Sequence, residues 1–266
     1  MPVEYLALVC LTFIVGGIFK GATGIGAPLV AIPTMALLVD VPFAVAVFLV
    51  PNILSNAWQT WRFRKHNPAD AFAWKFAILG MIGAGFGTLV LARFSGLALM
   101  NTVAVLILIF VTFRLKNPKW SLNWNLAKRL VVPVGTVGGF LQGSTGLSAP
   151  ITVTFMSSLN LRREEFIFSM SLFFFTMTLV QIPAQLALGV LNWERFIYGV
   201  AAFVPFIFGM LVGGVLGKKL PKSTFDKAII AILTLLALRL LASNFYGHHY
   251  FLPNTINHEM NHLHQI

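Results

Sequence analysis

The sequence predicts an all-α polytopic membrane protein made of two similar halves. Hydrophobic residues make up 58% of its 266 residues and charged residues only 10%, whereas a soluble domain usually carries about 25% charged residues. Long apolar stretches alternate with short polar loops, as expected for membrane-spanning helices. A glycine-rich stretch also interrupts an apolar run in each half of the chain. Duplicated, broken helices are typical of secondary transporters, which hold their substrate where the two breaks meet.

The two glycine-rich stretches are related by a constant offset of 122 residues. Gly21, Thr23, Gly24, Ala27 and Pro28 recur as Gly143, Thr145, Gly146, Ala149 and Pro150. As one helix, the apolar run 3–39 would be roughly 55 Å long, well beyond a hydrocarbon core of about 30 Å. We therefore predict a break between Gly21 and Gly26, followed by a short helix with Pro28 at its start.

Each half is expected to hold one broken element and three whole helices, about eight hydrophobic segments in all. The first half has the broken run 3–39 and whole helices at 42–61, 71–92 and 97–113, and the second has a broken run at 130–159 and helices at 166–188, 196–216 and 225–242. The domain boundaries are a first repeat at 1–115, a connecting loop at 116–129, a second repeat at 130–243 and a polar tail at 244–266. Histidines in the tail allow metal binding, but a mobile polar terminus is the favoured interpretation.

The positive charges distinguish two topologies for the broken elements. If each crosses the membrane once, the lysines and arginines other than Lys20 divide 11 to 7 between the two sides. If each is a re-entrant hairpin, they divide 15 to 3, with only Arg93, Arg195 and Arg239 on the poorer side. The positive-inside rule favours the re-entrant arrangement, in which three crossings per half make the halves inverted repeats. The run from Val3 to Lys20, long enough to cross alone, argues for the other model.

The composition excludes several other classes of protein. The net charge of +11 comes from loop residues and so indicates topology rather than nucleic-acid binding. Cys10 is the only cysteine, which excludes an internal disulfide or a cysteine-based metal site. The amino-terminal apolar run lacks a cationic region before it and is interpreted as retained. We predict no cofactor, no structural metal and no catalytic residues.

The breaks predict an anion site near the membrane midplane. Irregular backbone at that depth requires a lined cavity, and the helices that start at Ala27 and Ala149 present the positive end of a helix dipole. Lys20 is the only charge inside an apolar segment, and its repeat partner is the neutral Gln142. Lys20 could instead snorkel or pair with a carbonyl, but intramembrane charges are usually functional. The candidate substrate-binding residues are Lys20, Gly21, Thr23, Gly24, Gly26, Ala27, Gln142, Gly143, Ser144, Thr145, Gly146 and Ser148, together with Asn52, Asn56 and Gln181 on neighbouring helices.

The eight acidic residues all lie at predicted helix ends or in loops. A cation transporter is therefore disfavoured, because no buried carboxylate is available to carry protons or bind Na⁺. The glycine pattern is not a nucleotide-binding loop, since it follows no strand, and Ser144 has no histidine nearby to act as a base.

Over residues 6–241 the chain resembles the sulfite exporter TauE/SafE family, also called the toluene-sulfonate uptake permease family. The resemblance rests on the duplicated layout, the length, and the motif Gly-x-Thr-Gly-x-x-Ala-Pro at Gly21 and Gly143. It implies a membrane transporter for sulfite, sulfonates or related sulfur-containing anions. The second copy departs from the first at Ser148, which replaces Gly26, and at Gln142, which replaces Lys20.

We therefore expect a secondary transporter of a small sulfur-containing anion in a bacterial-type inner membrane. Its expected partners are that anion and the lipid bilayer, with no nucleic acid. The alternatives are an anion channel on the same scaffold and, less favoured, a membrane-embedded enzyme. The glycine faces on the third element of each half, near Gly83 and Gly213, could pack internally or form a homodimer, and the sequence leaves this open.

Overall fold

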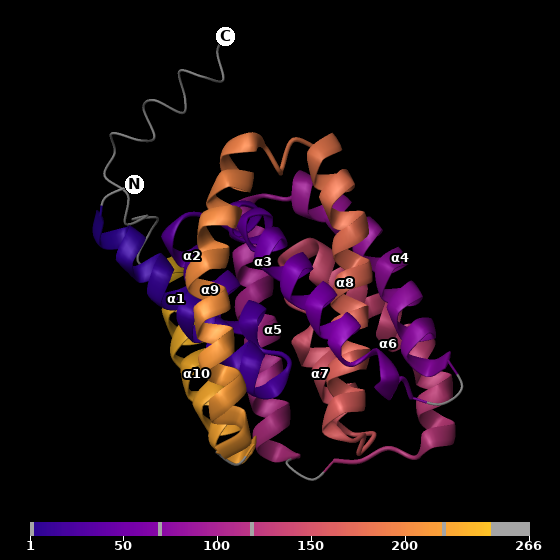
Figure 1. The fold of residues 1–266 in the computed structure, drawn as a ribbon. Coiled ribbons are helices and arrows are strands. Elements are labelled where there is room, and N and C mark those ends of the chain that lie inside the picture. Colours follow the sequence, from indigo (N-terminus) through magenta and orange to yellow (C-terminus); the bar gives the residue numbers. More distant parts are fainter. Residues whose placement is uncertain (1–2, 69–70, 118–119, 220–221, 246–266) are drawn as a thin grey trace.

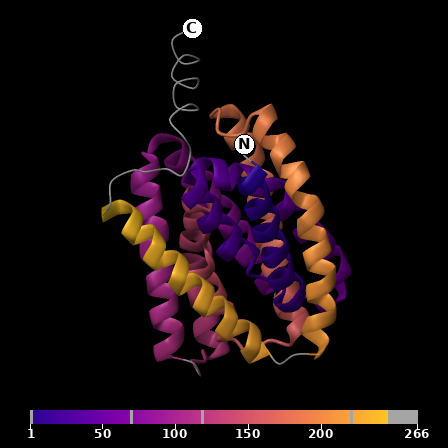
Figure 2. The ribbon, with the colours of Figure 1, turned by 90° about the vertical axis from the view of Figure 1, so that its left-hand side faces the viewer.

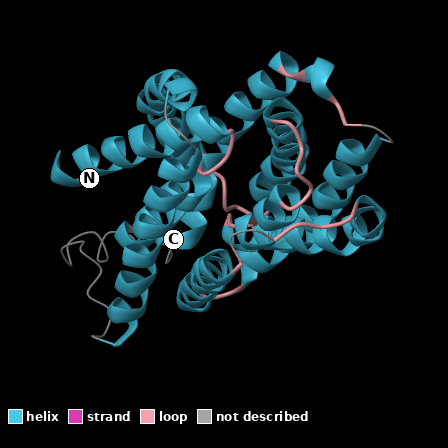
Figure 3. Ribbon diagram, turned by 90° about the horizontal axis from the view of Figure 1, so that it is seen from below, coloured by secondary structure: helices cyan, strands magenta, loops and turns pink. Residues whose placement is uncertain are grey.

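The structure is a computed structural model that describes residues 3–68, 71–117, 120–219 and 222–245. Every regular element in these ranges is a helix (Figure 3), which confirms the all-α prediction. The elements are α1 Val3–Thr23, α2 Ala27–Leu38, α3 Val41–Arg62, η1 Arg64–His66, α4 Phe72–Arg93, α5 Gly96–Lys116, α6 Trp124–Thr145, α7 Ala149–Ser157, α8 Arg163–Ala187, α9 Trp193–Lys219 and α10 Lys222–Phe245. Residues 246–266 of the predicted polar tail lie outside the described residues.

Five of the described helices, α3, α4, α5, α8 and α9, are long and apolar enough to cross a membrane. Each predicted broken segment consists of two helices, α1–α2 and α6–α7. The start of α6 was placed too late, because it begins at Trp124 within the predicted connecting loop rather than at Leu130. The Asn123 side chain caps α6 by accepting a hydrogen bond from the Asn125 amide at 2.9 Å. The polar first turns of this helix resemble a loop in the sequence.

Both breaks turn the chain back on itself. In the second hairpin the Leu122 amide donates to the Ser158 carbonyl at 2.9 Å, so the start of α6 lies beside the end of α7. In the first hairpin a Cβ built at Gly16 of α1 would lie 3.3 Å from the Ala27 carbonyl oxygen at the start of α2. The two hairpins have opposite directions: α1 begins at the upper side of Figure 1, whereas α5 ends and α6 begins at the lower side.

The hairpins pack against helices of the opposite half of the chain. Helix α1 lies against α9, and α6 lies against α4. A Cβ at Gly213 of α9 would lie 2.1 Å from the Ile18 carbonyl oxygen of α1, and one at Gly83 of α4 would lie 2.1 Å from the Thr136 carbonyl oxygen of α6. These contacts require glycine, because backbones can approach so closely only without side chains. The glycine faces whose role the sequence left open therefore pack inside the molecule.

Helices α3 and α8 lie against each other in the interior and bring polar side chains with them. Helix α10 crosses the outside of the bundle beside α5 (Figure 2). Aromatic stacking supports the interior, with the rings of Phe76 and Phe173 only 4.1 Å apart between centroids. Polar residues buried on α3 and α8 therefore face neither lipid nor water and need partners within the protein.

Candidate functional site

The two breaks have nearly the same local structure. Gly24 and Gly26 in the first break and Gly146 in the second have positive φ angles of 82°, 102° and 74°, a conformation that favours glycine. In both, the threonine before the break bonds to its own backbone: the Thr23 hydroxyl lies 2.8 Å from the Phe19 carbonyl oxygen, and the Thr145 hydroxyl lies 2.8 Å from that of Leu141. Each hydroxyl also accepts from the amide two residues later at 3.3 Å. The threonines thus hold the chain reversal in place.

Short helices begin directly after the breaks, at the positions predicted from the sequence. Helix α2 starts at Ala27 and α7 at Ala149, each with a proline in its first turn and without a side-chain cap on its first amides. Ser148, the residue before α7, instead donates to the Gln142 side-chain oxygen at 3.1 Å. The Ser144 hydroxyl lies 2.9 Å from the Phe140 carbonyl oxygen of its own helix.

Lys20 lies in the last turn of α1 and is only 2% exposed. Its ammonium donates to Asn56 Oδ1 at 2.5 Å and lies 5.7 Å from the centre of the Phe174 ring, within the range of a cation–π interaction. No described carboxylate forms a salt bridge with Lys20. The candidate site therefore contains a buried positive charge that only neutral groups contact.

A chain of hydrogen bonds leads from Lys20 across α3 to α8. Asn56 donates to Asn52 Oδ1 at 2.7 Å, and Asn52 donates to the Thr178 hydroxyl oxygen at 2.9 Å. One turn further along α8, Gln181 Nε2 lies 3.5 Å from the Gln142 carbonyl oxygen in α6. These contacts form two groups that meet on α8, one with Lys20, Asn56, Asn52 and Thr178 and one with Gln181 and Gln142. We call these residues, with Gln185, the polar path.

The polar path ends in buried groups that lack partners among the described residues. Gln181 Oε1 and both side-chain polar atoms of Gln185 are buried and form no hydrogen bond there. Thr178, Gln181 and Gln185 follow at intervals of three and four residues and so share one face of α8. Unsatisfied buried polar groups are costly and often mark a place for water or ligand. Gln185, which was not among the predicted site residues, belongs to this face.

The glycines among the predicted site residues have structural positions. A Cβ at Gly21 would lie 2.0 Å from the Met210 carbonyl oxygen, and one at Gly143 would lie 2.3 Å from that of Ala84. Gly21 and Gly143 thus form the close helix contacts of α1 with α9 and of α6 with α4. Gly24, Gly26 and Gly146 shape the breaks, and Ala27 is buried at the start of α2.

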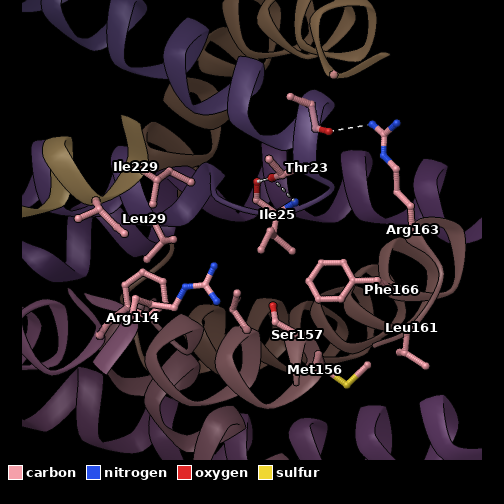
Figure 4. Close-up of a pocket in the computed structure, with 15 residues that line it drawn as sticks. Thr23, Ile25, Leu29, Arg114, Met156, Ser157, Leu161, Arg163, Phe166 and Ile229 are labelled. Carbon is pink, nitrogen blue, oxygen red and sulfur yellow. Dashed lines mark hydrogen bonds between the residues drawn. The ribbon is translucent and has the colours of Figure 1, made fainter. Parts of the chain in front are cut away.

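Two cavities approach this region from one side of the molecule. A cavity of about 380 Å³, the break cavity, lies under the first break and is lined by Thr23, Arg114, Ser157 and Arg163 among mostly apolar residues (Figure 4). A second, of about 490 Å³, is lined by Arg62, Arg163 and Lys218 together with Gly21 and the acidic Glu164. Because the ends of α3, α5 and α9 and the start of α8 line these cavities with cations, we call this the cationic side. Lys20 lines neither cavity.

Arg114 and Arg163 are cavity residues that the sequence did not single out. Both are cations at helix ends, and the positive-inside rule accounts for such cations without a ligand. The sequence therefore offers no reason to assign them to a binding site. The neighbouring Arg162 differs, because its guanidinium pairs with Glu165 at 2.8 Å. The hydrogen bond that the guanidinium donates to the Glu165 carboxylate raises the pKa of Arg162 above its usual value. Arg163 instead donates to the Ala22 carbonyl oxygen at 2.8 Å and so contacts the first break directly.

The fold and the buried polar path define a helical membrane protein with a charged interior position next to two broken helices. The family model for the sulfite exporter TauE/SafE matches residues 8–240. The chain belongs to this family, which confirms the resemblance seen in the sequence and, with the five apolar helices, makes it an integral membrane protein. TauE/SafE proteins are transporters rather than enzymes. No curated protein and no solved structure matched the chain.

Proposed function

We propose that this protein is a secondary transporter of a small sulfur-containing anion, such as sulfite or an organosulfonate, in a bacterial-type inner membrane. The observation that carries the proposal is Lys20, a buried ammonium contacted by the neutral Asn56 and Phe174 and by no described carboxylate. A buried charge without a counter-charge is costly. An anion that binds beside the Lys20 ammonium would offset this cost and could also contact the polar path. The side-chain N–H groups of Gln185, which have no partner among the described residues, would donate to it further along.

We further propose that the two halves are inverted repeats. The packing of α1 on α9 and of α6 on α4 supports this, because each pair joins a broken helix to the third element of the other half. Inverted repeats are also supported by the opposite directions of the two hairpins and by the matching threonine contacts at the two breaks. In this arrangement both hairpins are re-entrant, and the cationic side faces the cytoplasm. Rocking of one repeat against the other would open the polar path alternately to each side.

In this orientation the break cavity opens toward the cytoplasm. Export of an anion from there needs no coupling ion, since an inside-negative potential drives it outward by about 2.3 kcal/mol per charge per 100 mV. A divalent anion would gain twice that amount.

The test is sulfite flux into and out of proteoliposomes that contain the purified protein, at imposed potentials of both signs. We expect saturable flux that is lost in Lys20→Gln and retained in Lys75→Gln, a matched change on α4 outside the cavities and the polar path. Trans-stimulation and saturation would support a carrier, whereas flux that stays linear with concentration would indicate a channel. Equal flux in wild type, Lys20→Gln and Thr145→Ala, with all proteins present in the membrane, would contradict the proposed site.

A further inference from the structure

The break cavity has the features of a second anion site, separate from Lys20. Two arginines line it from different helices, Arg114 from α5 and Arg163 from α8, and the lining residues that the structure describes include no acidic residue. The hydroxyl-bearing residues Thr23 and Ser157 also line it. In Figure 4 the Arg114 guanidinium points into the cavity below Leu29, to the left of Ile25 and Ser157.

Arg163 links this cavity to the break itself. Its guanidinium donates to the Ala22 carbonyl oxygen at the carboxyl end of α1, where a cation is favoured by the helix dipole. A guanidinium has five N–H donors in a planar fork that suits oxyanions, and Arg163 has one recorded hydrogen bond in the described part of the chain. Donors therefore remain available for a ligand.

The walls of the cavity strengthen such an interaction. Apolar side chains surround the arginines, among them Phe110, Val153, Met156 and Phe166. Charge-assisted hydrogen bonds gain strength where water is partly excluded. The volume of about 380 Å³ admits a small oxyanion together with water.

We propose that the break cavity binds a small oxyanion, an inorganic sulfur oxyanion or a sulfonate head group, between Arg114 and Arg163. Its use as the first binding place before Lys20 rests on the transport function proposed above, but the binding itself does not.

The binding test uses Lys20→Gln protein, which lacks the charge of the polar path, titrated with sodium sulfite at constant ionic strength by calorimetry. We expect this variant to retain one binding event. Adding Arg114→Gln or Arg163→Gln should weaken it by about tenfold or more, as for loss of charge-assisted hydrogen bonds. The matched controls are Lys116→Gln at the end of α5 and Arg162→Gln beside Arg163, neither of which lines the cavity.

Arg163→Lys, which keeps the charge but not the planar fork, should bind with intermediate affinity in a monodisperse protein. In flux assays on the otherwise wild-type protein, Arg114→Gln should raise the KM for sulfite more than it lowers kcat. The proposal is overturned if Lys20→Gln protein binds no sulfite, or if the arginine variants bind it as tightly as the controls. Absence of sulfite flux with arginine-dependent binding intact would refute only the transport proposal.

Discussion

At Lys20 an ammonium is kept in the interior by one amide oxygen and one aromatic ring. The sequence identified this residue, because a lysine within an apolar run stands out. It did not identify the partner, because Asn56 is one of several amides on α3 that are equally able to join helices. Which amide meets the ammonium depends on how the first hairpin packs against α3, and the spacing along the chain does not determine that.

The Lys20–Asn56 contact predicts a measurable coupling in stability. Asn56→Leu should lower the free energy of unfolding by about 1–3 kcal/mol, because it leaves a buried charged donor without its acceptor. In Lys20→Met/Asn56→Leu both polar partners are gone, so the loss should be smaller than the sum of the two single losses. Reversible unfolding in mixed micelles would measure it. Additive losses would mean that the two side chains do not interact.

Among the helices, the breaks were the most predictable elements. Their positions follow from local rules: positive φ angles at Gly24 and Gly146, and a proline in the turn after each. The start of α6 was less predictable, because its cap, Asn123, and its polar first turns resemble a loop. The partners of the glycine faces were not predictable, since a face of small residues fits any other helix backbone.

The contact of α9 with α1 predicts opposite effects for two adjacent glycines. A Cβ at Gly213 would lie 2.1 Å from the Ile18 carbonyl oxygen, whereas one at Gly214 would meet nothing within 4 Å. Gly213→Ala should therefore force the two helices apart and lower the thermal midpoint sharply. Gly214→Ala should leave it unchanged or raise it, since alanine favours a helix over glycine by up to about 1 kcal/mol.

The test compares the thermal midpoints of the two alanine variants, purified in the same detergent. If Gly213→Ala were as stable as Gly214→Ala, the close approach of α1 to α9 would be wrong.

For the whole molecule, the cation distribution favours hairpins that enter and leave on one side of the membrane. The chain reverses at both breaks, and the side on which each hairpin enters stays a prediction. The cross-packing of the halves was beyond the sequence, which shows the duplication but not which elements of the two copies meet. The break cavity could not be predicted from the sequence either, because Arg114 and Arg163 line one cavity only through the packing of α5, α7 and α8 around the first break.

The membrane topology predicts the labelling of two loops. With re-entrant hairpins, Ser95 before α5 and Asn192 before α9 lie on the same, outer side of the membrane. If each broken element crossed once, they would lie on opposite sides. Single cysteines at these two positions in a Cys10→Ala background should both react with an impermeant maleimide added to intact cells.

A cysteine at Asn123, on the cationic side, should react only after the membrane is permeabilised. Reaction of only one of the Ser95 and Asn192 positions from outside would establish the spanning model instead.

The pairing of α1 with α9 also sets the order in which the protein can be assembled during synthesis. Helix α1 is synthesised long before α9, the helix that its glycines contact in the folded protein. Before α9 is inserted, the glycine face of α1 must lie against lipid or against the insertion machinery. The first half therefore reaches its native packing only once the second half has been inserted, and neither half is an independent folding unit.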